Sequence, residues 1–158
     1  MFVRYYVEIP FAVGAVEGAI ERAPVSWMPI VAHEAESRGT DLLTEIGFGC
    51  DQARVSKAVE VEVGAPRKAA SRTILPMTWE ATGSGRLFPK LEADLELAPL
   101  GPSRTQLAIS ARYRPPLGAV GRVVDRAALH LVAEATIKDF LDRVAERLTS
   151  SLAAASTA

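Results

Sequence analysis

The chain has 158 residues, of which 49% are hydrophobic and 23% are charged, and its 18 Lys and Arg nearly balance its 19 Asp and Glu. This composition excludes an intrinsically disordered chain and fits one domain that buries well over half of the surface exposed by its unfolded form. The formal net charge of −1 excludes a general attraction to nucleic acid or to anionic membranes, so a partner is expected in a pocket.

Targeting and redox features are sparse. Arg4 and Glu8 interrupt the run MFVRYYVEIP, so we expect no secretory signal, and no window approaches the roughly 18 apolar residues that a membrane span needs. Cys50 is the single cysteine, which excludes an intrachain disulfide and a cysteine-rich zinc site. We therefore expect a cytoplasmic protein with no stable membrane insertion.

The first part of the chain predicts a strand and two short helices. Apolar and polar residues alternate over 2–9, the period of a half-buried strand, and Pro10 ends it because proline has no N–H for the ladder. Apolar residues then recur at helical spacing over 12–22 and more loosely over 26–46. Pro29 and Gly39 are expected to break the second region into short pieces.

The middle of the chain predicts at least four strands. Alternation with a period of two returns over 55–63, 73–80, 91–97 and 107–113. The turn-rich stretches GAPRKAAS, ATGSGR and APLGPSR separate these runs, which indicates an antiparallel meander. The motif RYRPPLG ends the sheet, because consecutive prolines cannot continue a ladder.

A long amphipathic helix is predicted over 119–148, with His130 on its apolar stripe. At about 1.5 Å per residue it reaches roughly 40 Å, enough to span the sheet. Residues 150–158, SSLAAASTA, are expected to form a disordered tail, which leaves one domain over 1–149.

This order of elements has one economical packing. We predict an α+β helix-grip fold, in which a curved antiparallel β-sheet wraps around a long C-terminal α-helix, with two short helices after the first strand. A curved sheet that grips a helix often leaves unfilled space between the two. That space is the candidate pocket.

Two pieces of the sequence add to this reading: Trp27 after the first helix, and the run ARYRPPLGAVGRVVDRAALHLVAEATIKDFLDRVAERL. With them, the chain from VRYYVEIP to FLDRVAERL resembles the START-related (SRPBCC) superfamily of polyketide cyclases, lipid-transfer domains and the birch-pollen allergen. The long run looks like those of actinobacterial members, and 14 Arg against 4 Lys agrees with a high-GC source. The resemblance implies the helix-grip fold, which hosts binding, transport and catalysis.

The inward parity of each strand predicts the residues that would contact a ligand. Trp79, Tyr5 and Tyr113 are the better candidates, because each joins a flat apolar body to one polar tip. The alternative is that most of these residues are simply core. The predicted ligand-binding wall comprises Tyr5, Val7, Val59, Val61, Leu75, Met77, Trp79, Leu91, Leu95, Leu107, Ile109, Tyr113 and His130.

Three functions remain open. The first is non-catalytic binding or transport of a hydrophobic small molecule, such as a polyketide, lipid or quinone-like compound. The second, implied by the resemblance, is a polyketide cyclase or dehydratase, with His130 as general acid or base oriented by Glu134. The third is an interaction module with a filled core. The alternation pattern predicts only four inward side chains with polar groups: His130, Tyr5, Tyr113 and Lys57. Because catalysis needs several positioned polar groups, binding is favoured over catalysis.

Other site classes find little support. The two histidines lack a ligand-spaced His, Cys, Asp or Glu cluster, so no metal is expected, and no phosphate-binding or dinucleotide motif opens a helix, so no cofactor is expected. No nucleic-acid partner is expected. The strand over 2–9 is an edge that could pair with a second subunit, but Arg4 and Glu8 are charges of the kind that blunt edges, so the oligomeric state stays open.

Overall fold

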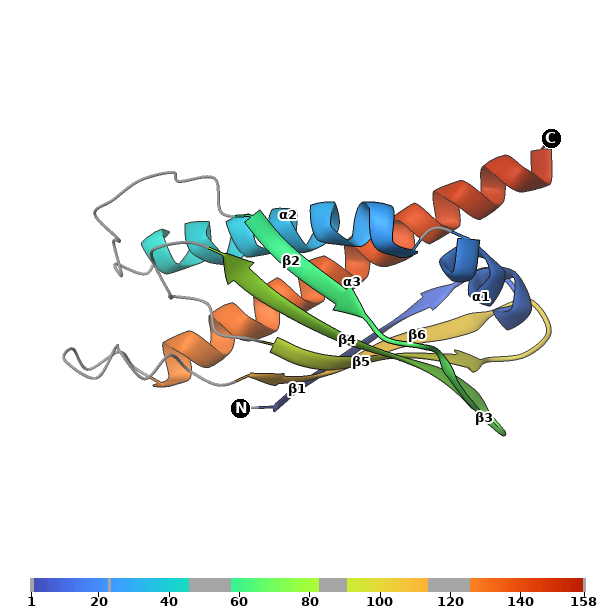
Figure 1. Ribbon diagram of the computed structural model, residues 1–158, viewed down its shortest axis with the longest axis horizontal. Helices are drawn as coiled ribbons and strands as arrows, with labels where there is room; N and C mark the ends of the chain where they lie inside the picture. Colours follow the sequence, from blue (N-terminus) through green and yellow to red (C-terminus); the bar gives the residue numbers. More distant parts are fainter. Residues whose placement is uncertain (1, 23, 46–57, 83–90, 114–125, 158) are drawn as a thin grey trace.

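A computed structural model describes residues 2–22, 24–45, 58–82, 91–113 and 126–157. Figure 1 shows one curved sheet, with α2 and α3 lying across one face and α1 at one end. The elements in chain order are β1 (Phe2–Ile9), α1 (Val13–Arg22), α2 (Pro24–Glu45), β2 (Ala58–Val63), β3 (Arg67–Ala69), β4 (Arg72–Thr82), β5 (Leu91–Pro99), β6 (Thr105–Tyr113) and α3 (Arg126–Thr157).

The strands form one antiparallel sheet in the order β1-β6-β5-β4-β2, and β3 pairs with β4 beyond the end of β2. The predicted antiparallel pairing of the four middle strands is confirmed, from β2 through β4 and β5 to β6, with β3 inserted between β2 and β4. β1 returns to pair with β6, so β1 is one edge of the sheet, while β2 and β3 share the other. The sheet and the long C-terminal helix are those of the predicted helix-grip architecture.

Register aligns the inward side chains into rows across the strands, and every inward residue of β1, β2, β4, β5 and β6 has an odd number. The row nearest the start of α3, called the Trp79 row below, is Val61, Trp79, Leu91 and Tyr113. The next three rows are Val63, Met77, Ala93, Ala111 and Val3; then Leu75, Leu95, Ile109 and Tyr5; then Thr73, Leu97, Leu107 and Val7.

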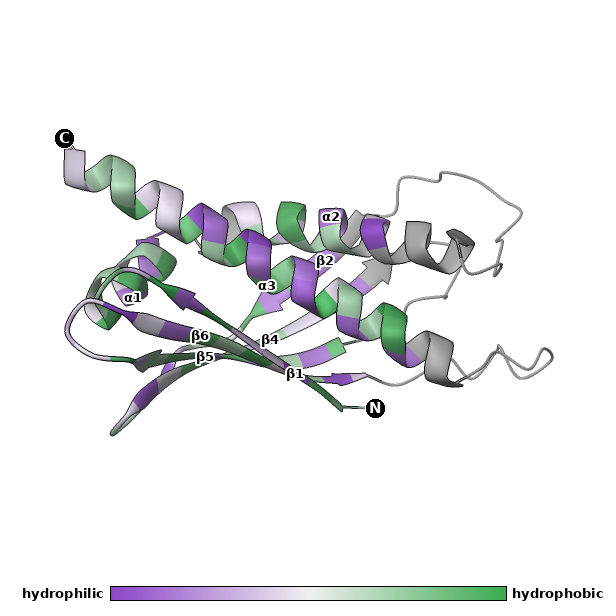
Figure 2. Ribbon diagram, turned by 180° about the vertical axis from the view of Figure 1, so that it is seen from behind, coloured by the Kyte–Doolittle hydropathy of each residue, from purple (hydrophilic) through white to green (hydrophobic). Residues whose placement is uncertain are grey.

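The helices cover this inner face with their own apolar stripes. In α3 the buried stripe includes Ile137, Phe140, Leu141 and Val144, with the spacing of one helical face. Figure 2 shows hydrophobic and hydrophilic residues interleaved along α3, as expected for a helix with one face on the core. The core therefore lies between the sheet and the helix layer.

The second helix differs from the expectation of two short helices. α2 runs unbroken for 22 residues, with Pro29 inside it. Pro29 lies close to the helix start, where its missing N–H removes a single backbone bond. Met28, Val31, Ala32 and Ala35 are buried at helical spacing, and their packing against the rest of the core outweighs the local breaker signal.

The expected tail is also different. Up to Thr157, residues 150–157 continue α3 as helix. Leu152 is buried, one turn after the buried Leu148, so the apolar stripe extends past the predicted end. Alanine has the highest helix propensity, and Ala153, Ala154 and Ala155 continue the helix beyond this contact. The expected first residues of the helix, 119–125, lie outside the described part of the chain.

One strand was not predicted. The GAPRKAAS stretch contains β3, which pairs with the first residues of β4 and leaves only Ala70 and Ser71 as the turn. β4 has 11 residues and β2 pairs only with its second half, so β3 covers backbone groups that would otherwise be an open edge.

Candidate functional site

The predicted wall lies on the inner face, but its residues differ in how completely they are covered. Leu95 and Ile109, in the middle of the sheet, have no exposed surface, so protein atoms surround them. Trp79 and Tyr113 keep 6% of their surface exposed. All four side chains therefore belong to the buried inner face of the sheet.

The other predicted residues divide in the same way. Leu75, Met77 and Leu91 are almost fully buried and Leu107 fully so, whereas Tyr5, Val7 and Val61 are half-buried near the edges of the sheet. Val59 is placed by its backbone only, opposite Ala81 in β4. Lys57 lies outside the described residues.

Trp79 is held by an aromatic contact from the helix layer. The rings of Trp79 and Phe140 lie edge to face, with centroids 4.9 Å apart and an interplanar angle of 69°. The neighbouring row carries alanines at two adjacent positions, Ala93 and Ala111, which leave room for a large side chain above them. The α3 helix thus fixes one side of the Trp79 indole.

Polar side chains of the inner layer are bound within the protein. Thr73 donates its hydroxyl to the Glu17 carboxylate of α1. Thr105 donates to the backbone carbonyl of Phe11 at 2.7 Å. Thr136 of α3 donates to the carbonyl one turn earlier, at 2.8 Å. These hydroxyls are engaged and leave the adjoining inner face apolar.

Tyr113 ends the Trp79 row at the last residue of β6. Its side chain is almost fully covered, and this burial raises the pKa of the phenol above its ordinary value of 10.0. The side chain therefore stays protonated and neutral at physiological pH.

His130 lies in the first turns of α3 and forms the pair expected from its spacing. Its Nε2 is 3.1 Å from Oε1 of Glu134, one turn along the helix, and both side chains are 40–50% exposed. Its Nδ1 is buried and has no hydrogen-bond partner. When Nε2 carries the proton and donates it to Glu134, Nδ1 is left as a free proton acceptor.

Comparison by sequence gives no match, either to a protein-family model or to a curated protein. Comparison by structure does. A conserved protein from Geobacillus kaustophilus aligns with a TM-score of 0.55 at 17% identity, over 96% of this chain and 97% of that one. A START superfamily protein from Mycobacterium smegmatis aligns with a TM-score of 0.55 at 12% identity, over 94% and 97%. The Zhui aromatase/cyclase from a Streptomyces species gives 0.50 at 10% identity, over 94% and 93%.

The chain has the START-type helix-grip fold. The fold expectation drawn from the sequence is thereby confirmed, and the alignments extend over nearly the whole of each chain. Within the described residues of this helix-grip chain, no helix has the length and apolar character needed to cross a membrane.

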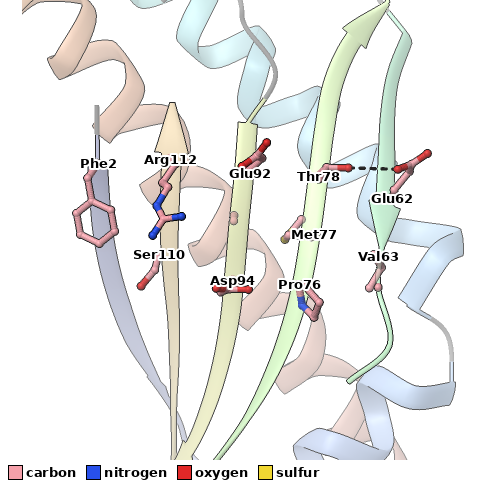
Figure 3. A pocket seen from close by; sticks show the side chains of 12 residues that line it. Phe2, Glu62, Val63, Pro76, Met77, Thr78, Glu92, Asp94, Ser110 and Arg112 are labelled. Carbon is pink, nitrogen blue, oxygen red and sulfur yellow. Dashed lines mark hydrogen bonds between the residues drawn. The ribbon is translucent and has the colours of Figure 1, made fainter. Parts of the chain in front are cut away.

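A hollow of about 630 Å³ lies on the outer face of the helix-grip sheet, opposite the predicted wall (Figure 3). Its floor is a row of short side chains across the strands, Ser110, Asp94 and Pro76, continued by Gly64. The amide of Gly64 donates to the carbonyl of Pro76 at 2.8 Å, and a Cβ at Gly64 would lie 2.9 Å from the proline ring. Glycine is what allows this close approach.

The alternation of apolar and polar residues assigned these residues to the solvent side, and it did not predict the hollow. The sequence does contain short residues that lie opposite one another in neighbouring strands, but this can be recognised only once the strand register is known. The rim carries Glu62, Glu92 and Arg112, and the hollow is open to solvent. An open, charged hollow does not provide the enclosed apolar surface that a hydrophobic ligand requires.

Proposed function

We propose that this protein binds a hydrophobic small molecule at the end of its inner face formed by the Trp79 row. The observation that carries the proposal is the composition of that end of the inner face: the Trp79 row has two aromatic side chains, and the neighbouring row has alanines, Ala93 and Ala111, at two adjacent positions. The middle of the sheet is fully covered at Leu95 and Ile109. An apolar ligand would extend the core at that end instead of lying in its middle.

The chemistry of the row supports an apolar, partly planar ligand. Trp79 offers a large flat surface, Val61 and Leu91 are aliphatic, and Tyr113 adds a neutral phenol at the end. No described residue of the row carries a charge. Polyketide, lipid and quinone-like molecules have this combination of extended apolar surface and few polar groups.

Non-catalytic binding is favoured because the inner face has few free polar groups. Thr73, Thr105 and Thr136 use their hydroxyls within the protein. Catalysis needs at least two positioned polar groups near the reacting atoms. The described inward residues of β1, β2, β4, β5 and β6 carry no acid–base pair.

The test is to purify the protein, extract it with organic solvent and identify bound compounds by mass spectrometry. Trp79→Ala should lose the bound compound while remaining folded. The matched control is Leu97→Ala, which removes a buried side chain from the same face, three rows along the strands from the Trp79 row. Equal loss in both variants would attribute the effect to weakened packing. If no compound co-purifies and an apolar fluorescent dye fails to bind, the proposal is wrong.

A second candidate, polyketide cyclisation or dehydration, is favoured by one observation: the His130–Glu134 pair with its unpartnered Nδ1. A neutral imidazole held by a carboxylate is suited to removing a proton from an enolisable ligand. Its Nδ1 is covered, so a substrate would reach it only by displacing the covering atoms. The reaction would be established if the wild-type protein converts the ligand, His130→Gln accumulates the unconverted ligand, and Glu134→Gln converts part of it. Identical ligands in the wild type and in both variants would exclude the reaction.

A further inference from the structure

β1 is an edge strand that carries two of the largest exposed apolar side chains. It pairs with β6 on one side, and no described strand lies on its other side. Phe2 is 57% exposed and Tyr6 is 60% exposed, both on the outer face. Backbone groups along a free edge can pair with another strand, so this edge is a candidate interaction surface.

The sequence of β1 is complementary to itself when two copies run antiparallel. With Tyr6 opposite Tyr6 of a second copy, Arg4 lies opposite Glu8 in both halves of the pair. On the inner face the same register places Tyr5 opposite Val7 and Val3 opposite Ile9. Antiparallel partners share a face, so each outer pair and each inner pair combines side chains of matching chemistry.

Other registers lose this match. In the register centred on Tyr5, Tyr5 lies opposite itself, Arg4 opposite Tyr6 and Phe2 opposite Glu8. In the register centred on Arg4, the two Arg4 side chains lie opposite each other. In the register centred on Glu8, the two Glu8 side chains do. Like charges directly opposite each other are unfavourable, so the register centred on Tyr6 is selected.

The two charges are available for new partners. Arg4 is 56% exposed and lies 3.8 Å from Glu96, which is held more closely by Arg72 at 3.0 Å. Glu8 is 53% exposed and lies 3.4 Å from Arg104, itself 61% exposed. Exposed ion pairs of this kind contribute little to folding, so their rearrangement costs little.

The inner side of the edge also has apolar surface left to cover. Tyr5 and Val7 are only half-buried, although both face the helix layer. Lys138 of α3 lies over the Tyr5 ring, with Nζ 5.2 Å from its centroid. A neighbouring strand would bring the Val7 of a second copy beside Tyr5 and complete its burial.

β2, on the opposite edge, lacks this complementarity. The described outward residues of β2 are Glu60 and Glu62, so antiparallel self-pairing of β2 brings carboxylates together. Self-association through β1 closes at two copies, because a two-fold antiparallel pair uses the β1 edge of both partners.

We propose that β1 pairs with β1 of a second copy of this chain, antiparallel and centred on Tyr6, to form a two-fold dimer with one continuous sheet. The interface consists of two Arg4–Glu8 pairs and the Tyr6 pair on the outer face, with Tyr5 and Val7 packed on the inner face.

A charge-swap series measured by sedimentation velocity tests the dimer. The wild-type protein should show a concentration-dependent dimer. Arg4→Glu and Glu8→Arg should each weaken it about tenfold or more, because like charges then face each other twice. The double variant R4E/E8R should restore it. Arg147→Glu, the same charge change on an exposed residue of α3, is the control and should leave the dimer unchanged.

The double variant separates pairing between copies from damage within one copy. Within one chain it leaves carboxylates together near Glu96 and cations together near Arg104, so intramolecular repulsion predicts that it is the worst variant. Circular dichroism confirms that each variant is folded. A wild-type monomer at the highest soluble concentration, larger assemblies, or a monomeric double variant would overturn the proposal.

Cysteine cross-linking tests the register independently. In a Cys50→Ser background, Tyr6→Cys places the thiol opposite its own copy and should give a covalent dimer under mild oxidation. Phe2→Cys places it opposite Pro10 and should not. Cross-linking of Phe2→Cys in preference to Tyr6→Cys would refute the register centred on Tyr6.

Discussion

Trp79 packs against Phe140 and also belongs to the proposed binding row. The energy of its contact with Phe140 can be measured separately from ligand binding. The edge-to-face rings at 4.9 Å predict a coupling of about 0.5–1.5 kcal/mol beyond simple burial. Urea unfolding of Trp79→Leu, Phe140→Leu and the double variant gives this coupling directly. Additive effects, within about 0.3–0.5 kcal/mol, would contradict a specific aromatic contact.

Two glycines make opposite predictions for the same substitution. Gly101, in the turn between β5 and β6, has φ +119°, a conformation that L residues rarely adopt, so Gly101→Ala should destabilise the protein by about 1–3 kcal/mol. Gly18 lies within α1, and an added Cβ would meet only the Arg22 side chain at 3.7 Å. Gly18→Ala should therefore stabilise it by about 0.5–1 kcal/mol. Thermal unfolding of both variants checks the two signs; the same sign for both would contradict the argument.

At the scale of elements, strands were easier to foresee than helix ends. Alternation in 91–97 and 107–113 fixes which side chains face inward, because a strand has only two faces. Pro29 and the tail gave misleading local signals, since α2 and the end of α3 depend on burial in the core, at Met28 and Val31 in α2 and at Leu152 in α3. β3 could not be foreseen, because among the described strands it pairs only with the first residues of β4, which extend beyond β2.

The extended end of α3 predicts a measurable contribution from Leu152. Its side chain is 6% exposed and belongs to the core, so Leu152→Ala should destabilise the protein by about 2–3 kcal/mol. Ser151→Ala, next to it on the exposed side, should have almost no effect or stabilise slightly. Urea unfolding measures both. Equal stability of the Leu152 variant and the wild type would mean that the last turns of α3 do not pack on the core in solution.

For the whole molecule, the sequence predicted the architecture but only part of the candidate site. The alternation of apolar and polar residues identified the inner face, but placing Trp79 and Tyr113 together in one row required the register. The sequence could not show that Leu95 and Ile109 are fully enclosed, because enclosure depends on how α2 and α3 settle on the sheet. It also could not show that the outer face is hollow at Ser110, Asp94 and Pro76.

The buried phenol of Tyr113 makes the stability of the folded protein depend on pH in the alkaline range. Burial raises the pKa of Tyr113 above 10.0, so the unfolded chain releases this proton at lower pH than the folded protein. The folded state then holds more protons, and stability falls as pH rises. The contribution is fully present below about pH 10 and is lost as pH rises through the folded-state pKa.

The pKa of Lys138 is also raised, first by its hydrogen bond to Asp142. Its deprotonation therefore also lowers the stability of the folded protein as pH rises. Tyr113→Phe should therefore reduce the loss of stability between about pH 9 and about pH 11 without abolishing it. Urea unfolding at both pH values measures the loss, and the difference between wild-type and variant ultraviolet titrations isolates this phenol. An equal loss in both proteins would show that Tyr113 ionises as easily in the folded protein as in the unfolded chain, and that the end of the sheet beside Trp79 is open to water and unsuited to an apolar ligand.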